Sequence, residues 1–150
     1  MRRIALLAAA IVVAVPGVAE ARLKYRTVKS TGTIQGHVTE PTTAEGFAFA
    51  GFVSDSAFGK GASTSRGSFD GATTSGTLTV FLNRGTLRAT FEFVITPNAD
   101  GTVSFAGTTK YTGGTGRYRG ARGSGQTTAT QDADGYTTFE YTQRVKIPRR

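Results

Sequence analysis

Glycine is concentrated in one short segment of the chain, Gly113–Gly123, whose sequence is GGTGRYRGARG. Threonine-rich stretches that are typical of β-strands flank this segment on both sides. Glycine permits positive φ and close backbone approach, and it is a poor residue for the interior of a strand. The segment therefore predicts a sharp, fixed bend between two strands. It does not indicate a phosphate loop, because it lacks Gly-Lys-Ser/Thr and leads into a strand.

Apolar and polar residues alternate along much of the chain beyond residue 21. In the clearest run, Leu87, Phe91 and Ile95 fall on one face, while Arg88 and Glu92 fall on the other. A period of two predicts strands with one face in a core and the other in water. The predicted strands are 22–28, 33–39, 46–53, 62–69, 76–83, 86–96, 101–111, 122–131 and 136–147.

Short turns join these segments in sequence. Asn83-Arg84-Gly85 is one such turn, and Asp-Gly pairs follow Asn98-Ala99 and Asp132-Ala133. We interpret the Asp-Gly pairs as hairpin turns and not as calcium loops, because the closing Glu of a calcium loop is absent. A long meander of strands usually closes into a barrel, which removes its exposed edges. The prediction is therefore all-β, a single antiparallel up-and-down β-barrel of about eight strands over residues 22–150.

The first residues have the organisation of an export signal. Arg2 and Arg3 precede an apolar run, Ile4–Val15, which is shorter than the roughly 20 residues of a membrane-spanning helix. Ala19-Glu20-Ala21 supplies a small-residue cleavage pattern. We expect a signal peptide over residues 1–21, cleavage after Ala21, no transmembrane segment after cleavage, and a secreted or periplasmic location.

Composition narrows the possible chemistry. The chain has no cysteine, which excludes disulfides, thiol catalysis and Cys-zinc sites, and its formal net charge is +8. His37 is the single histidine, too few for a His-based metal site, and no G-x-S-x-G elbow occurs. We therefore assign no catalytic residue, metal or organic cofactor from the sequence, and we interpret His37 as a surface side chain.

Three segments of the C-terminal half carry a family resemblance. They are GTLTVF at Gly76–Phe81, TPNADGTVSFAG at Thr96–Gly107 and KYTGGTGRYRGARG at Lys110–Gly123. Together with the final Thr/Phe/Tyr-rich strand, they resemble the allene oxide cyclase and dirigent-like barrel superfamily, in particular its secreted bacterial members. The resemblance implies an antiparallel barrel of about eight strands, often assembled as a homotrimer. The superfamily's known activities are cyclisation of an unstable fatty-acid epoxide and steering of phenolic radical coupling, and both confine a hydrophobic reactant in a cavity.

Two sets of side chains are candidates for binding. An eight-stranded barrel is either filled by side chains or holds one small ligand. The candidate ligand-binding residues inside the barrel are aromatic: Phe91, Phe93, Phe105, Tyr111, Phe139 and Tyr141. The candidate polyanion-binding residues are cationic: Arg117, Arg119 and Arg122.

These sets lead to three hypotheses about function. The first is a non-enzymatic or weakly enzymatic barrel that binds a small apolar or phenolic ligand in its interior. The second is a cyclase- or isomerase-like enzyme that acts by confinement. The third is a cationic protein that binds an anionic cell-envelope or extracellular polymer. No sequence motif indicates specific binding to nucleic acid.

Overall fold

The computed structural model describes residues 24–39 and 46–149 of the chain. These residues are almost entirely β-structure. Their elements are β1 (Tyr25–Val38), β2 (Phe47–Asp55), β3 (Gly59–Asp70), β4 (Thr73–Leu82), β5 (Gly85–Pro97), β6 (Val103–Gly114), the 3-10 helix η1 (Gly116–Tyr118), β7 (Arg122–Gln131) and β8 (Tyr136–Pro148). The predicted signal peptide, residues 1–21, lies outside the described residues. No helix in the described part of the chain is both long and apolar enough to cross a membrane.

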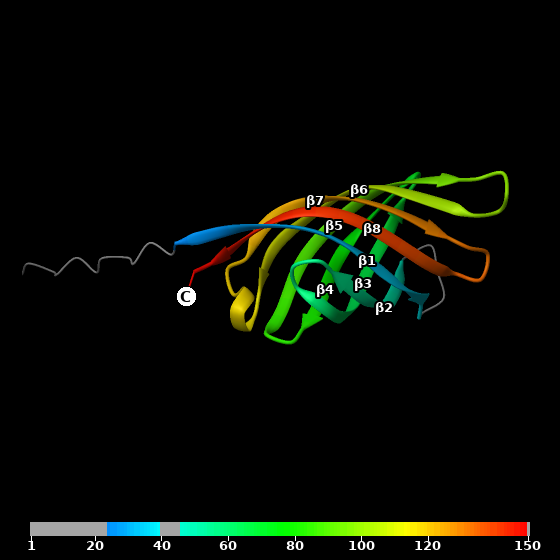
Figure 1. Cartoon of the computed structure of the whole chain (residues 1–150). Helices are drawn as coiled ribbons and strands as arrows, with labels where there is room; N and C mark the ends of the chain where they lie inside the picture. Colours follow the sequence, from blue (N-terminus) through cyan, green and yellow to red (C-terminus); the bar gives the residue numbers. More distant parts are fainter. Residues whose placement is uncertain (1–23, 40–45, 150) are drawn as a thin grey trace, which may run out of the picture.

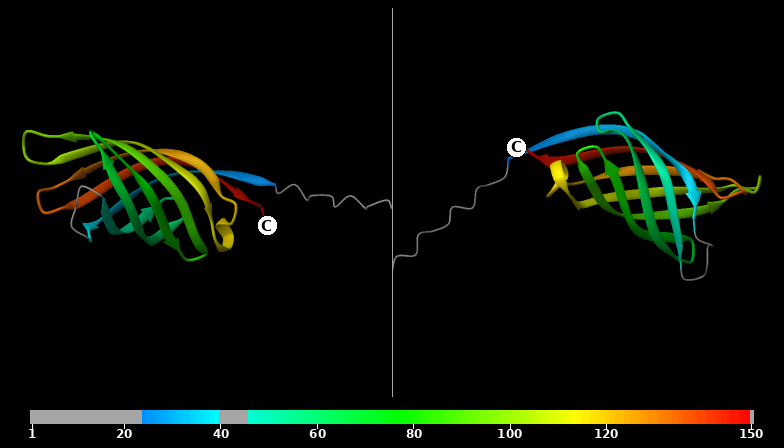
Figure 2. Two further views of the ribbon diagram at one scale, coloured as in Figure 1. Left: turned by 180° about the vertical axis from the view of Figure 1, so that it is seen from behind. Right: turned by 90° about the horizontal axis from the view of Figure 1, so that it is seen from below.

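The strands pair in sequence order and close into a barrel (Figure 1). Every pairing is antiparallel, and β1 completes the ring by pairing with β8, from Tyr25 opposite Pro148 to His37 opposite Tyr136. Further views show the strands wrapping around one axis, with β1 beside β8 (Figure 2). Closure leaves no unpaired edge among these strands. The predicted fold class, an antiparallel up-and-down barrel of about eight strands, is confirmed.

The first strand differs from its prediction. The sequence predicts two strands, 22–28 and 33–39, with a break between them, whereas β1 runs without interruption. Gly32 suggests a turn in the sequence, but it lies within β1, opposite both Asp55 and Tyr141. A side chain at position 32 would collide with the phenol of Tyr141. Position 32 therefore requires glycine, because the phenol of Tyr141 occupies the space that a side chain would fill. The predicted bounds of the other strands agree with β2 to β8 to within three residues.

The glycine-rich segment forms the bend that its composition predicts. It ends β6, passes through η1 and enters β7 at Arg122. Gly116 and Gly120 have φ of +54° and +77°, the left-handed region that glycine tolerates. The N–H of Arg117 donates a hydrogen bond of 2.8 Å to the carbonyl of Arg84, which holds the bend against the β4–β5 turn. This arrangement lets the bend cover one end of the barrel.

The barrel has two unlike ends. The η1 end carries η1, the β2–β3 and β4–β5 turns and the last residues of β8 (Figure 1). The mouth end carries the β3–β4, β5–β6 and β7–β8 turns. Gly101 and Gly135 lie in two of these mouth-end turns at φ of +85° and +81°, and both turns are the hairpins that the Asp-Gly pairs predict. Toward the η1 end, the core is most completely buried, around Leu87, Val145 and Ile147.

Candidate functional site

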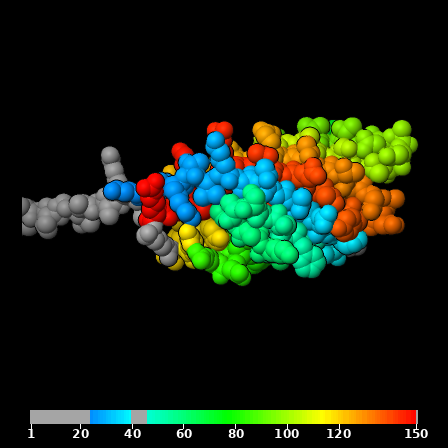
Figure 3. Space-filling model, in the orientation of Figure 1, coloured from blue at the N-terminus to red at the C-terminus, as the bar shows by residue number. Residues whose placement is uncertain are grey.

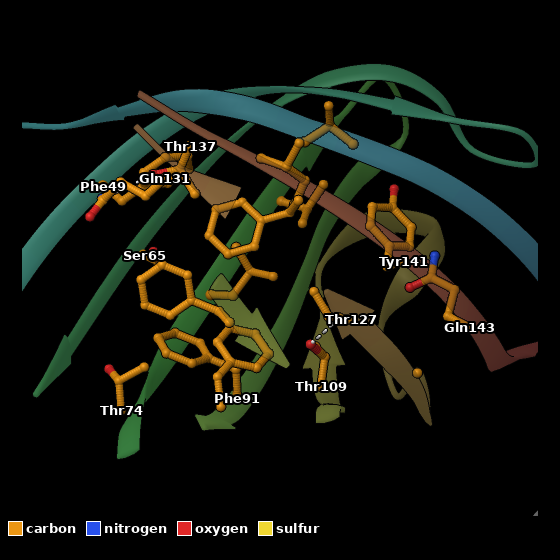
Figure 4. A pocket seen from close by; sticks show the side chains of 18 of the residues that line it. Phe49, Ser65, Thr74, Phe91, Thr109, Thr127, Gln131, Thr137, Tyr141 and Gln143 are labelled. Atoms are coloured by element: carbon orange, nitrogen blue, oxygen red, sulfur yellow. Dashed lines mark hydrogen bonds between the residues drawn. The ribbon is translucent and has the colours of Figure 1, made fainter. Parts of the chain in front are cut away.

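A cavity of about 260 Å³ lies inside the barrel (Figure 4). Each of the strands β1 to β8 contributes side chains to its wall, and most of these side chains are apolar. An apolar cavity of roughly 150 Å³ accepts a benzene molecule. The interior therefore has space for one small molecule of one or two rings.

Burial of the larger lining side chains is uneven along the cavity, although the small Thr74 and Thr137 near the mouth-end turns are each 2% exposed. Near the η1 end, Leu87 and Tyr111 are 2% and 6% exposed. Toward the mouth end, Phe69, Ile95 and Phe105 line the same cavity but are only partly buried. As far as the described residues show, the cavity is sealed at the η1 end and is more accessible at the mouth end.

A belt of phenylalanine rings forms the middle of the cavity. The rings of Phe91 and Phe93 stack with 5.0 Å between centroids, and Phe139 lies 6.2 Å from Phe93. Phe49 meets Phe139 edge to face at 5.3 Å, and Phe47 lies 6.4 Å from Phe91. Aromatic pairs favour stacked and edge-to-face contacts at these separations. The belt therefore gives the cavity a lining suited to a planar or otherwise apolar ligand.

Glycines opposite the aromatic residues explain why the interior is not filled. Phe47 lies opposite Gly67, and Phe91 lies opposite Gly76. A Cβ atom at Gly67 or Gly76 would come within 2.8 or 2.7 Å of the ring of its partner, closer than real contacts allow. Each ring therefore lies back over the bare backbone of the neighbouring strand. Space remains in the centre of a barrel that side chains can otherwise fill.

A buried carboxylate lies at the sealed end of the cavity. Asp55, the last residue of β2, is 7% exposed, and its Oδ2 accepts hydrogen bonds from Ser30, Tyr141 and Gln143 at 3.0, 2.9 and 2.9 Å. Gln143 also donates to Ser30 at 2.8 Å and accepts a hydrogen bond from Tyr111. Figure 4 shows Tyr141 and Gln143 side by side at one end of the cavity. Burial of a charge is tolerated when hydrogen bonds replace its hydration, and these neutral donors do so.

The other carboxylate oxygen of Asp55 fixes the turn between β2 and β3. Oδ1 accepts hydrogen bonds from the backbone N–H groups of Ala57 and Phe58 at 2.8 and 2.9 Å. Phe58 in turn packs edge to face on Tyr118 of η1, with 5.7 Å between the ring centroids. One acidic side chain therefore links the polar floor of the cavity to the turn and the helix that seal the η1 end.

The two tyrosines of this floor are kept neutral by their surroundings. Burial raises the pKa of Tyr111 far above its usual value, and the nearby Asp55 carboxylate raises it further. Burial and then Asp55 raise the pKa of Tyr141 in the same direction. Both hydroxyl groups therefore stay protonated at physiological pH. Because Tyr141 donates to Asp55 and Tyr111 donates to Gln143, each phenol oxygen keeps acceptor capacity for a further hydrogen bond.

The structure brings the predicted aromatic residues together and adds polar ones that sequence reasoning missed. Asp55, Ser30 and Gln143 are the missed residues. A signal for Asp55 exists, because it continues the inward alternation of Phe49 and Val53. The predicted strand ends at residue 53, which leaves Asp55 in a loop. The predicted ligand-binding residues that line the cavity are Phe91, Phe93, Phe105, Tyr111, Phe139 and Tyr141.

The predicted arginines lie on different elements. Arg117 is partly buried in η1, and Arg119 is exposed directly after it. Arg122 begins β7, where its guanidinium lies 5.0 Å from the ring centre of Tyr25 and donates a hydrogen bond of 2.9 Å to the Tyr25 hydroxyl. Arg122 is therefore part of the barrel wall beside the terminal strands. His37 is exposed on β1, as expected.

The fold of this chain is similar to solved structures of other proteins. No family model and no curated protein matches the chain. The structure of the pterocarpan synthase dirigent protein PsPTS1 matches with a TM-score of 0.58 and 16% identity, over 83% of this chain and 97% of that chain. The pterocarpan synthase dirigent protein GePTS1 matches with a TM-score of 0.59 and 16% identity, over 91% of this chain and 99% of that chain. The chain therefore has the closed eight-stranded barrel fold of dirigent proteins, in keeping with the resemblance carried by its C-terminal half.

Proposed function

We propose that the barrel binds one small, largely apolar molecule that carries a phenolic or similar hydroxyl group. The aromatic belt holds the apolar body of this ligand, and the polar floor receives its hydroxyl. The dirigent-like fold supports a role in binding a small molecule, since the two similar structures are both described as pterocarpan synthases.

The hydrogen bonds of the floor carry this proposal. The donors of Tyr141 and Gln143 are directed to Asp55, and the donor of Tyr111 is directed to Gln143. The phenol oxygens of Tyr111 and Tyr141 are therefore available as acceptors. A ligand hydroxyl can donate to them, whereas an ether of the same shape cannot.

A matched pair of ligands tests the proposal. We expect 2-naphthol to displace a polarity-sensitive dye from the cavity about three- to tenfold more tightly than 2-methoxynaphthalene, because one hydrogen bond is worth about 1 kcal/mol. The variant Leu78→Trp places a larger side chain in the cavity wall, and it should weaken binding of both compounds. Fluorescence titration measures each affinity.

A control distinguishes the cavity floor from the outer surface. Tyr141→Phe should reduce the difference between the two compounds, whereas Tyr136→Phe, at the start of β8 beside His37, should leave it unchanged. Circular dichroism confirms that each variant is folded. Equal affinity for both compounds in the unmodified protein, or displacement that Leu78→Trp does not affect, would contradict the proposal.

The floor also favours a second candidate, a cyclase- or isomerase-like enzyme. Asp55 and Tyr141 form a carboxylate–phenol pair at 2.9 Å beside an apolar cavity. Such a pair can take a proton from a confined substrate and return it to another atom of the same molecule, so that no co-reactant is consumed. An enzyme would convert a bound compound to an isomer that chromatography separates, and Asp55→Asn would abolish the conversion. Recovery of every bound compound unchanged would favour binding alone.

Export and assembly are further parts of the proposal. Cleavage after Ala21 leaves a mature chain of residues 22–150, and the intact mass of the exported protein tests this. A homotrimer would show three times the mass of the mature chain in light scattering. A mass that retains residues 1–21, or a monomer at all concentrations, would contradict these two predictions respectively.

A further inference from the structure

Charge is unevenly distributed between the two ends of the barrel. Among the described acidic residues, Asp70, Asp100, Asp132 and Asp134 lie in or beside turns at the mouth end. The described lysines and arginines, apart from Arg66, lie in the turns, terminal residues and strand halves nearer the η1 end. This separation gives the η1 end a positive field that attracts anions.

Several of these cations gather on the outer face of the terminal strands β1 and β8 and of the neighbouring strands β6 and β7. Lys29 of β1 lies directly opposite Arg144 of β8. Arg122 of β7 lies directly opposite Lys146 of β8. Lys110 of β6 lies in the same row as Arg144, two strands away. These side chains are all exposed and are called the terminal-strand patch: Lys29, Lys110, Arg122, Arg144 and Lys146.

The arrangement within the patch is electrostatically unfavourable on its own. Residues directly opposite one another on antiparallel strands have Cα atoms about 4.5–5.5 Å apart, and like charges there are destabilising. Two such pairs meet on β8, Lys29 with Arg144 and Arg122 with Lys146. Figure 3 shows the first strand in blue beside the last strand in red on the molecular surface. An anionic partner is therefore favoured both by direct attraction and by relief of this repulsion.

A shallow hollow continues the patch along the same strands. Its volume is about 540 Å³, and residues of β1, β6, β7 and β8 line it. Thr31, Thr142 and Gln126 form the row next to the patch, and they offer neutral hydroxyl and amide groups. Glu140 is an acidic residue in the lining, and it lies one row further toward the mouth end. From the η1 end toward the mouth end, the cationic side chains of this face are therefore followed by neutral side chains that can form hydrogen bonds.

We propose that the outer face of β1, β6, β7 and β8 binds an acidic polysaccharide. Sulfate or carboxylate groups contact the terminal-strand patch, and sugar hydroxyls hydrogen-bond to the threonine and glutamine side chains of the hollow. The site lies on the outside of the wall, and its hollow shares Thr127 and Tyr141 with the lining of the interior cavity. The residues that the sequence predicts for anion binding are Arg117, Arg119 and Arg122. In this proposal only Arg122 of these three contacts the anion, together with the other cations of the terminal-strand patch.

The surroundings of the patch favour a polysaccharide over two other polyanions. Nucleic acid single strands are bound by aromatic rings on which bases stack. Tyr25, the ring beside the patch, is instead covered by the guanidinium of Arg122. Membrane-surface binding is strengthened by apolar side chains beside the cations, which insert below the headgroups. The most exposed large apolar side chain among the described residues, Phe52, lies on β2, outside this face.

Fluorescence anisotropy with labelled heparin as the probe tests this proposal. We expect heparin to bind, neutral dextran not to bind, and the affinity for heparin to fall as salt is raised. The variant Lys29→Gln/Arg144→Gln should weaken binding about tenfold. The control variant Lys60→Gln/Arg84→Gln also removes two exposed charges near the η1 end, and it should change the affinity by less than about threefold.

Two outcomes would overturn the proposal. Equal losses in the two double variants would show attraction by net charge alone. Tighter binding to a dT oligonucleotide or to phosphatidylglycerol vesicles than to heparin would assign the face to another class of partner. Thr142→Val, which changes no charge, should weaken heparin binding by a few-fold if sugar hydroxyls occupy the hollow. Failure of the cavity to bind 2-naphthol would leave these results unaffected.

Discussion

Acidic side chains shape turns at both ends of the barrel, and at the η1 end Asp55 also joins distant strands. At the mouth end, Asp100 accepts hydrogen bonds from the N–H and hydroxyl of Thr102, two residues away, at 3.0 and 2.7 Å. At the η1 end, Asp55 accepts hydrogen bonds from Ser30 and Tyr141, which lie 25 and 86 residues away in the chain. The first kind of bond shapes one turn. The second joins β1, β2 and β8 and gives the barrel a common floor.

Because of this difference, we expect the residues that contribute most to the stability of the fold to lie at one end of the barrel and the residues that control access to the cavity to lie at the other. Among the described residues, the core cluster around Leu87, Val145 and Ile147 is most completely buried toward the η1 end, while the rings of Phe69 and Phe105 toward the mouth end are only partly buried. Regions with fewer buried contacts open at lower free-energy cost. A change at the η1 end should therefore lower the free energy of unfolding strongly, whereas a matched change at the mouth end should lower it only slightly.

The largest expected effect is at Asp55. Asp55→Ala removes the acceptor for Ser30, Tyr141 and Gln143 and frees the turn after β2, so that several buried donors lose their partner. We expect a loss of about 3 kcal/mol or more in the free energy of unfolding, since each unsatisfied buried group costs about 1–3 kcal/mol. Urea unfolding followed by circular dichroism measures this loss.

The matched change at the mouth end is Gln131→Ala. It removes a hydrogen bond of 3.0 Å from Gln131 to Thr137 at the mouth-end side of the cavity. Thr137 is buried but keeps its hydrogen bond of 3.5 Å to the carbonyl of Gly135, and water can solvate the partly exposed position 131, so we expect a loss of about 1 kcal/mol or less. Losses of equal size at Asp55 and Gln131 would contradict the contrast between the two ends.

A second comparison concerns apolar side chains of one strand. Leu87 and Ile95 both line the cavity from β5, but Leu87 is 2% exposed at the η1 end and Ile95 is partly exposed at the mouth end. We expect Leu87→Ala to cost about 3 kcal/mol and Ile95→Ala about 1 kcal/mol of unfolding free energy, because the cost follows the packing that is lost. Thermal and urea unfolding of the two variants measure both losses. A larger loss for Ile95→Ala than for Leu87→Ala would contradict this prediction.

A further small effect is expected on the pH dependence of stability. Burial first, and Asp55 second, raise the pKa of Tyr111 and Tyr141 above the value of about 10 that both have when unfolded. The stability they contribute is therefore complete below about pH 10 and is lost above it, because the unfolded chain then releases protons that the native barrel keeps. We expect a loss of about 1 kcal/mol between pH 9 and pH 11, mainly from Tyr111, because Tyr141 is less buried.

Urea unfolding at a series of pH values measures this dependence. Tyr111→Phe removes the phenol and should flatten the decline above pH 10. A decline of the same size in Tyr111→Phe would show that Tyr111 is not its source.

Much of the fold could be predicted because its determinants are local. Alternation along β5 and β8, and the Asp-Gly turns, depend on residues that are close in sequence, and their predicted positions agree with the structure. The continuity of β1 through Gly32 could not be predicted for the opposite reason, since the partner of Gly32, Tyr141, lies more than 100 residues away. The floor of the cavity was hidden for a similar reason, because Asp55 is recognised as a site residue only through its contacts with Ser30 and Gln143, which lie 25 and 88 residues away in the chain.

The sequence by itself determined that the chain forms antiparallel strands in a ring, which aromatic side chains face inward and where the chain bends. These properties follow from period-two patterning and from glycine, which act over a few residues. The tertiary structure decided whether the ring is filled or hollow and where charges meet. Those outcomes depend on register across strands: glycine opposite phenylalanine leaves a cavity, and lysine opposite arginine makes a cationic face.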